Sequence, residues 1–370
     1  MNAEIIDKVV ERKIRKSNFE LLRIICMLLI IAFHYCTYGN EGTIFKLDIS
    51  INQIIAIIFG SWGLLGVDCF IFISAYFLID SSKFSSKKLI KIILQTLFYS
   101  ICIELLLYLS GVIQFSIKGL IKSVFSPFLV MYWFITAYCM LYVIFPFLNK
   151  IIRSMHSKYL LKFLIILTLF IPIYKTIEKS APIGDFIFVI YLYLLMGYLK
   201  QNPQNWFELH AKIGFLITTV CTILFNIIIS FFGTLLNLGI LQNYASQFIG
   251  RYSPIMVLNA IFLFYIFQHM KIKSSKLINT IASTTLGIYL FHENPMFRTI
   301  LWDGILKINR VYYLPMFIVY FFMSVISLFG IGALIDILRI KLLEEPMFNR
   351  KFNYIEIYIR KIDSWMNAVE

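Results

Sequence analysis

The chain has 370 residues, of which 60% are hydrophobic and 15% are charged, and its mean hydropathy is +0.81. A soluble domain could not cover its surface with so few polar residues, so the composition excludes a soluble protein and predicts one integral membrane domain. The formal net charge of +14 would suit nucleic acid, but the basic residues follow a membrane topology, and we expect no nucleic-acid partner.

Apolar segments long enough to cross a bilayer follow one another along the whole chain. They predict an all-α, polytopic membrane helix bundle with about 10 transmembrane helices. The expected spans are residues 20–38, 54–79, 89–110, 127–148, 160–174, 184–199, 211–232, 255–269, 277–292 and 314–338.

The positions of Lys and Arg predict how this bundle is oriented. With a cytoplasmic N-terminus, the inner segments hold 24 of the 34 Lys and Arg residues and the outer segments hold 9. Cytoplasmic ends of membrane helices carry such an excess, so we expect both termini in the cytoplasm and a multi-pass protein of the plasma membrane. We divide the chain into a membrane domain, 1–340, and a cytoplasmic juxtamembrane tail, 341–370, whose spacing of aromatic and Ile residues predicts a helix lying on the lipid surface.

The first span, Ser17–Tyr38, is apolar yet carries Glu20, Arg23 and His34. Charged groups at bilayer depth are costly and usually face a bundle interior or a cavity. The eleven residues from Arg23 to His34 correspond to about three helical turns plus ~20°, so both side chains lie on one face, with a rise of ~16 Å between them. Glu20 lies one turn before Arg23 and can pair with it. We therefore predict a polar stripe that covers about half of the membrane.

Three further places carry ionisable groups. Asp68 has a similar depth to His34 and can orient it as a general base, although a structural pairing of Asp68 is an alternative. His292 and Glu293 end the ninth expected span, at the outer membrane interface. Polar groups cost little there, so these two residues need not have a function. The basic run Lys83–Lys91 can hold phosphates or lipid headgroups.

Other residue types give weaker signals. Trp133 is most simply an aromatic of the membrane interface. The six cysteines form no CxxC and no Cys/His ligand spacing. We expect neither a disulfide framework nor a metal site.

Four segments together resemble the signature of the membrane acyltransferase-3 family. They occur in the family's order between residues 18 and 298 and are the Arg23-x10-His34 spacing, Gly66-Val67-Asp68 followed by Ser74-Ala75-Tyr76, YWFITAYCMLYVIFPFLN, and LGIYLFHENPMFR. The chain departs from the pattern at Glu20, where the family often has Asp. It also departs at Lys88-x-x-Lys91, where the family has two Arg. Lys keeps the charge of Arg but lacks its bidentate fork.

The resemblance implies a membrane acyltransferase domain over 1–340 that transfers an acyl group, usually acetyl, from cytoplasmic acetyl-CoA to a carbohydrate outside the cytoplasm. The sites that we predict on this basis fall into three groups. The catalytic residues are His34, Asp68 and Glu293; the residues that bind the acyl-CoA co-substrate are Arg23, Glu20, Lys88 and Lys91; and the residues that bind the acceptor are His292, Asn294, Tyr76 and Trp133. His34 would act as general base or would accept the acetyl group itself.

A transporter is the alternative function, since a flippase or exporter of a lipid-linked sugar or polysaccharide could line its path with the same polar stripe. It would need no acyl donor. The sequence leaves open the acceptor glycan, which includes exopolysaccharide, and the choice between acetyl and another acyl group. Membrane lipid is an expected partner, and homo-oligomers are compatible with the sequence.

Overall fold

The described part of the chain is a bundle of helices. The computed structural model describes residues 16–38, 50–81, 83–129, 131–203, 205–238, 241, 248–349 and 353–368, and it has no strand among them. The predicted all-α class is confirmed for these residues. The helices in chain order are α2 (Ser17–Tyr38), α3 (Ile51–Gly60), α4 (Gly63–Leu78), α5 (Ser86–Leu109), α6 (Ile117–Val124), α7 (Trp133–Ser154), α8 (Ser157–Thr168), α9 (Tyr174–Ile177), α10 (Asp185–Gln201), α11 (Asn205–Leu235), α13 (Pro254–Gln268), α14 (Lys276–Ser283), α15 (Thr285–His292), α16 (Ile308–Val311), α17 (Phe317–Arg339), α18 (Glu345–Asn349) and α19 (Asn353–Asn367), with π-helical turns at Leu169–Ile173, Ile300–Ile305 and Ile340–Glu344.

Within the described ranges, 7 helical segments are long and apolar enough to cross a membrane. They are Ser17–Tyr38, Ile51–Leu78, Ser86–Leu109, Trp133–Ser154, Ser157–Ile177, Asn205–Leu235 and Phe317–Phe348. At the other three expected spans, α10 has 17 residues, α13 has 15, and α14 and α15 have 8 each. A helix of 8 residues is ~12 Å long, less than half of the hydrocarbon thickness. The count of about ten stays a prediction, as does the orientation of the termini, since residues 1–15 and 369–370 lie outside the described ranges.

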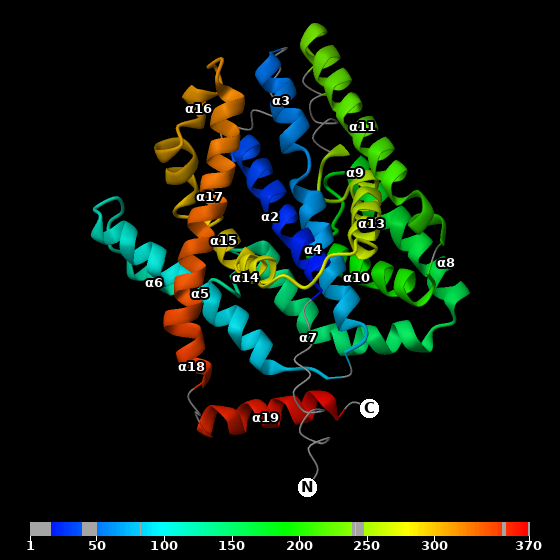
Figure 1. Cartoon of the computed structure of the whole chain (residues 1–370), viewed down its shortest axis with the longest axis vertical. Helices are drawn as coiled ribbons and strands as arrows, with labels where there is room; N and C mark the ends of the chain where they lie inside the picture. The colour runs from blue at the N-terminus through cyan, green and yellow to red at the C-terminus, as the bar shows by residue number, and fades with distance from the viewer. Residues whose placement is uncertain are drawn as a thin grey trace.

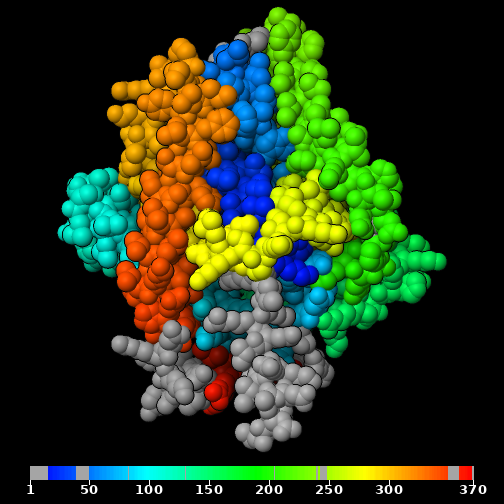
Figure 2. All heavy atoms as spheres, in the orientation of Figure 1, coloured from blue at the N-terminus to red at the C-terminus, as the bar shows by residue number. Residues whose placement is uncertain are grey.

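Helix α2 occupies the centre of the bundle (Figure 1). It packs against α3, α4, α13, α14, α15 and α17. Its residues Leu22, Cys26 and Ile31 are fully buried. On the face shown in Figure 2, α2 (dark blue) is visible as a narrow strip between α17, α13 and α14. The first span, which carries Arg23 and His34, is thus enclosed by helices that come from the whole length of the chain.

A glycine allows α2 and α4 to approach closely. A Cβ atom added at Gly66 would lie 2.7 Å from the carbonyl oxygen of Cys26 and 3.2 Å from Cγ1 of Ile30. Real Cβ atoms do not come this near to a backbone oxygen, so one of the two helices would have to move. Gly66 therefore sets the distance between α4 and the helix that carries His34.

We expect Gly66→Ala to destabilise the protein by about 1–3 kcal/mol, the usual cost of inserting a methyl group into a packed interior. Gly330→Ala is the matched control, because an added Cβ there meets nothing within 4 Å and Ala favours a helix. Thermal unfolding of the purified variants in detergent measures the difference. Equal melting temperatures for Gly66→Ala and wild type would contradict the close packing of α2 on α4.

A buried polar network holds α15 against α5 and α17. Arg339 Nε donates to Asp336 Oδ1 at 2.6 Å, and Gln95 Nε2 and Tyr99 OH donate to the same oxygen at 3.0 Å. The Asp336 side chain occupies the space beside Gly287, where a Cβ would lie 2.2 Å from its Cγ. Buried charges need such partners. The network fixes the position of α15, the helix that ends at His292.

Helix α19 lies across one end of the bundle, next to α18 (Figure 1). Asp363 Oδ1 accepts hydrogen bonds from the Ser86 backbone N–H at 2.7 Å and from its hydroxyl at 2.6 Å. Asn367 accepts from the backbone N–H of Phe84 at 2.7 Å. The predicted helix in the tail is thus confirmed, and it caps the start of α5. Its contact with lipid stays a prediction.

Candidate active site

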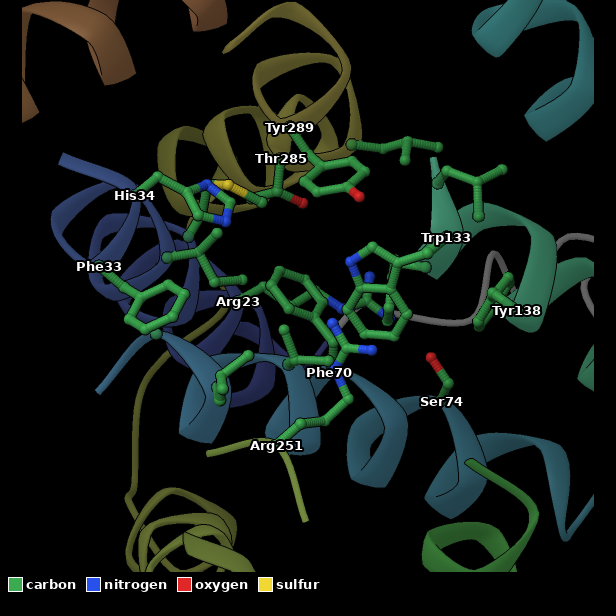
Figure 3. A pocket seen from close by; sticks show the side chains of 18 of the residues that line it. Arg23, Phe33, His34, Phe70, Ser74, Trp133, Tyr138, Arg251, Thr285 and Tyr289 are labelled. Carbon is green, nitrogen blue, oxygen red and sulfur yellow. The ribbon is translucent and has the colours of Figure 1, made fainter. Parts of the chain in front are cut away.

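His34 and Arg23 line the same cavity, which has a volume of about 250 Å³. Figure 3 shows both side chains, which come from α2, directed toward the cavity. The prediction that the eleven-residue spacing places them on one helix face is confirmed. Helices α4, α7 and α15 supply the other walls, with Val67, Phe70, Ser74, Trp133, Phe134, Tyr138, Thr285 and Tyr289 among the lining residues.

The hydrogen bonds of two histidines fix which nitrogen of His34 carries its proton. Nδ1 of His292 lies 2.6 Å from the carbonyl oxygen of Ile288, so it must be the protonated nitrogen of that ring. In the neutral ring, Nε2 of His292 then has a lone pair, and it lies 3.0 Å from Nδ1 of His34. His34 therefore donates through Nδ1–H, and its Nε2 has the free lone pair. Because His292 and Glu293 are buried behind His34 and do not line the cavity, we assign the Nε2 edge to the cavity side.

Glu293 completes the support behind His34. Its Oε1 lies 3.3 Å from Nδ1 of His34, and its Oε2 accepts a hydrogen bond from Tyr38 OH at 3.2 Å. Arg298 donates to the same Tyr38 hydroxyl at 3.2 Å and lies 4.0 Å from Oε2. A carboxylate at this distance stabilises the imidazolium that forms when His34 takes a proton. The arrangement is that of a general base with a tautomer set by its neighbours.

The structure corrects the predicted role of Asp68. Both of its carboxylate oxygens are buried and have no hydrogen-bond partner among the described residues, so Asp68 makes no hydrogen bond to His34. The neighbouring Val67 lines the cavity, and Asp68 does not. Depth along a helix was the basis of the prediction. Consecutive residues of a helix are rotated by ~100°, so Asp68 lies on a different side of α4 from Val67, which lines the cavity with His34. His292 and Glu293 hold His34 instead.

Two residues predicted to bind the acceptor lie elsewhere in the described structure. The Tyr76 ring packs on Phe19 with centroids 5.2 Å apart, has the Lys200 ammonium 4.1 Å from its centre, and lines neither cavity. Asn294 donates to Tyr132 OH at 3.0 Å and accepts from the backbone N–H of Met296 at 3.0 Å. Asn294 therefore stabilises the turn that follows α15 and contains Pro295.

His292 and Trp133, the other two predicted acceptor residues, have different positions. His292 is fully buried and bonds to His34. Its location favours a role in positioning His34 over direct contact with an acceptor. Trp133 does line the cavity, at the start of α7. Its indole lies against the guanidinium of Arg251, with Cζ 3.4 Å from the ring centre. Figure 3 shows Trp133 and Arg251 close together, with His34 and Tyr289 elsewhere around the same cavity.

A second, larger cavity of about 1280 Å³ lies next to the first, toward the end of the bundle where α19 lies. Its basic lining residues are Arg23, Lys88, Lys91, Lys276 and Arg339. The two cavities share the lining residues Arg23, Ser74, Ile92, Tyr138, Thr285 and Leu286. The two spaces therefore adjoin each other at Arg23, with His34 lining the smaller one and Lys88 and Lys91 lining the larger one.

Carboxylates pair with three of the basic groups that line this larger cavity. Glu20 Oε2 lies 3.5 Å from Arg23 Nη1, which confirms the predicted pairing. Lys91 Nζ donates to Glu344 Oε1 at 2.9 Å, and Arg339 donates to Glu344 Oε2 at 2.8 Å. The positively charged side chains are thus positioned by partners, while Lys88 remains exposed at the opening.

His34, His292 and Glu293 are also a possible set of metal ligands, since one ligand atom of each lies within 4.8 Å of the others. Two imidazoles and a carboxylate are a common donor set for zinc. Tetrahedral zinc would place its two ligand nitrogens roughly 3.3 Å apart, whereas the observed 3.0 Å fits the hydrogen bond described above. The absence of a resident metal stays a prediction.

Residues distant in sequence from the predicted motifs also contribute. Arg251 lines the cavity from the segment before α13, and Arg298 and Tyr38 hold Glu293. Asp336 and Arg339 support α15. Arg251 is the one Lys or Arg in the predicted outer segment 233–254, and this isolated position was the available sequence signal. Its approach to Trp133 could not be inferred, because it depends on how distant helices pack.

Comparison with known proteins identifies the family of the chain. Residues 16–336 match the family described as an acyltransferase domain. This range contains His34, the His292–Glu293 pair, and the helices α2, α4, α5, α7 and α15 that line the cavities. No curated protein and no solved structure matches the chain. A family match over most of the chain, on a bundle of membrane-length helices, shows that this protein belongs to the acyltransferase-3 family of membrane acyltransferases.

Proposed function

We propose that the protein is a membrane O-acetyltransferase, which moves the acetyl group of cytoplasmic acetyl-CoA to a hydroxyl of an extracytoplasmic cell-surface polysaccharide or its lipid-linked precursor. The observation that carries the proposal is the meeting of two cavities at Arg23, one with a basic opening and one lined by His34. A donor that enters through the larger cavity can extend its acyl end past Arg23 to His34, and the acceptor can approach His34 from the opposite side.

The larger cavity suits the donor because CoA carries several phosphates. Lys88, Lys91 and Arg23 offer charge-assisted hydrogen bonds to such groups. Beyond its diphosphate the donor is uncharged and narrow, and the apolar lining residues of the smaller cavity suit this part of the molecule. The excess of Lys and Arg at this end of the bundle favours a cytoplasmic position for the opening, in the plasma membrane.

The tautomer of His34 supplies the chemistry. Nε2 takes the proton of the acceptor hydroxyl as its oxygen attacks the thioester carbonyl. The imidazolium is stabilised through Nδ1–H by His292 Nε2 and by the Glu293 carboxylate. As the tetrahedral intermediate collapses, the C–S bond breaks and the CoA thiolate leaves with the proton from His34. The acetyl ester and free CoA are the products.

The experiment that tests this proposal uses membrane vesicles that contain the full chain and acetyl-CoA labelled in its acetyl group. We expect label to enter surface glycan, with release of one CoA for each acetyl group transferred. Vesicles without the protein give the background. Movement of a lipid-linked sugar across the membrane with no release of CoA would contradict the proposal and would favour the transporter.

Lys88→Gln is expected to raise KM for acetyl-CoA about 10-fold with little change in kcat, because it removes one charged phosphate contact far from His34. Lys118→Gln is the control, since Lys118 is equally exposed and lines neither cavity. Steady-state kinetics with varied acetyl-CoA measure the effect. An unchanged KM for Lys88→Gln would place the phosphates of the donor elsewhere.

A further inference from the structure

Two positively charged side chains line the smaller cavity. Arg23 and Arg251 line it, and no Asp or Glu of the described chain does. The carboxylate that pairs with each arginine, Glu20 for one and Asp185 for the other, lies outside the lining. Both guanidinium groups thus direct their charge into the cavity, which favours an anionic ligand.

Arg251 is held in a fixed orientation. Its guanidinium lies over the Trp133 ring, with Cζ 3.4 Å from the ring centre, and Nη1 is paired with Asp185. Tyr252 OH donates to the same Asp185 oxygen at 2.6 Å. The buried Nε–H of Arg251 has no acceptor among the described residues. An arginine that is stacked and braced in this way has donors in a planar fork, the geometry that recognises carboxylate and phosphate.

The two arginines serve different parts of the reaction. Arg23 lies where the cavities meet, beside the lysines that suit the phosphates of the donor. Arg251 lies with Trp133, His34 and Tyr289 around the smaller cavity alone (Figure 3). The acyl end of acetyl-CoA has no charge to offer there. An anion at Arg251 must therefore come from the other substrate.

We propose that Arg251, braced by Trp133 and Asp185, is an acceptor subsite for a carboxylate or phosphate, so that the enzyme selects an acidic sugar. The inference rests on the proposed function, and it names the acceptor class that the sequence leaves open. In this subsite the anionic group anchors the sugar while a hydroxyl of the same sugar lies near Nε2 of His34.

Binding to the purified full chain in detergent, without acyl donor, tests the subsite. We use D-glucuronate as the acidic probe and D-glucose as its neutral counterpart, and read ligand-dependent thermal stabilisation. Wild type is expected to bind glucuronate at least about 10-fold more tightly than glucose, the effect of a charge-assisted pair. Equal binding, or tighter binding of glucose, overturns the proposal. This comparison needs no variant.

Variants then assign the effect to Arg251. Arg251→Gln is expected to lose the preference for glucuronate, Arg251→Lys to retain part of it, and Arg310→Gln, an exposed arginine outside both cavities, to keep it. A full preference in folded Arg251→Gln overturns the assignment. The assignment is also overturned if Arg251→Gln raises KM for succinyl-CoA as donor and leaves KM for the acceptor unchanged, because the anion bound by Arg251 would then belong to the acyl chain. Wild type that binds glucuronate but transfers no acetyl group would refute the proposed function and leave the subsite intact.

Discussion

Replacing His34 by Asn is expected to lower the rate of acetyl transfer by about 10²- to 10⁴-fold, the contribution of a positioned general base. Asn can keep a hydrogen bond to His292 but has no basic nitrogen for the cavity. Because the donor's phosphates are predicted to bind near Arg23, KM for acetyl-CoA should change little. CoA release from detergent-purified protein with added acceptor measures both parameters.

His210→Asn is the matched control for this experiment. His210 is an exposed histidine that bonds to the carbonyl oxygen of Trp206, away from both cavities. It should retain wild-type transfer. If His34→Asn, present at the wild-type level and with a wild-type melting temperature, transferred acetyl groups at the wild-type rate, His34 would not be the base.

Glu293→Gln is expected to reduce kcat by about 10²- to 10⁴-fold, although Glu293 does not line the cavity. The amide keeps the size of the side chain but removes the charge that stabilises the imidazolium. It can also donate to Nδ1 of His34 and so favour the wrong tautomer. A KM for acetyl-CoA near wild type separates this positioning role from a role in binding.

Two comparisons make the result for Glu293 specific. Glu293→Asp keeps the charge and should restore part of kcat. Asp303→Asn removes an exposed acid from the segment that follows and should have no effect. A Glu293→Gln enzyme with wild-type kcat would mean that the carboxylate only stabilises the fold near Tyr38 and Arg298.

Local helix geometry explains what could be predicted from the sequence. The rotation and rise of one helix place Arg23 and His34 on a common face, whatever surrounds them. The apolar run that ends in His292 and Glu293 marked both residues as unusual. Their division of roles was not predictable, because it depends on one hydrogen bond between the first span and the last residue of α15, 258 residues later.

The errors have physical causes as well. Asp68 and His34 were matched by depth, which says nothing about the side of α4 on which a carboxylate lies. Hydropathy detects apolar runs, but it does not show that α14 ends at Ser283 and that α15 begins afresh at Thr285. The contact of Arg251 with Trp133 joins the segment before α13 to the start of α7, and the network around Asp336 joins α17 to α5. Such contacts follow from the packing of the whole bundle.

An experimental structure with a thioether analogue of acetyl-CoA tests the central claim most directly. The account predicts that the diphosphate of the analogue lies beside Arg23 and Lys88 in the larger cavity. It predicts that the acyl carbonyl lies within about 5 Å of His34 Nε2, which leaves room for one hydroxyl oxygen between them. An acyl end outside the cavity that His34 lines, or an analogue that enters by a path that avoids Arg23, would contradict it.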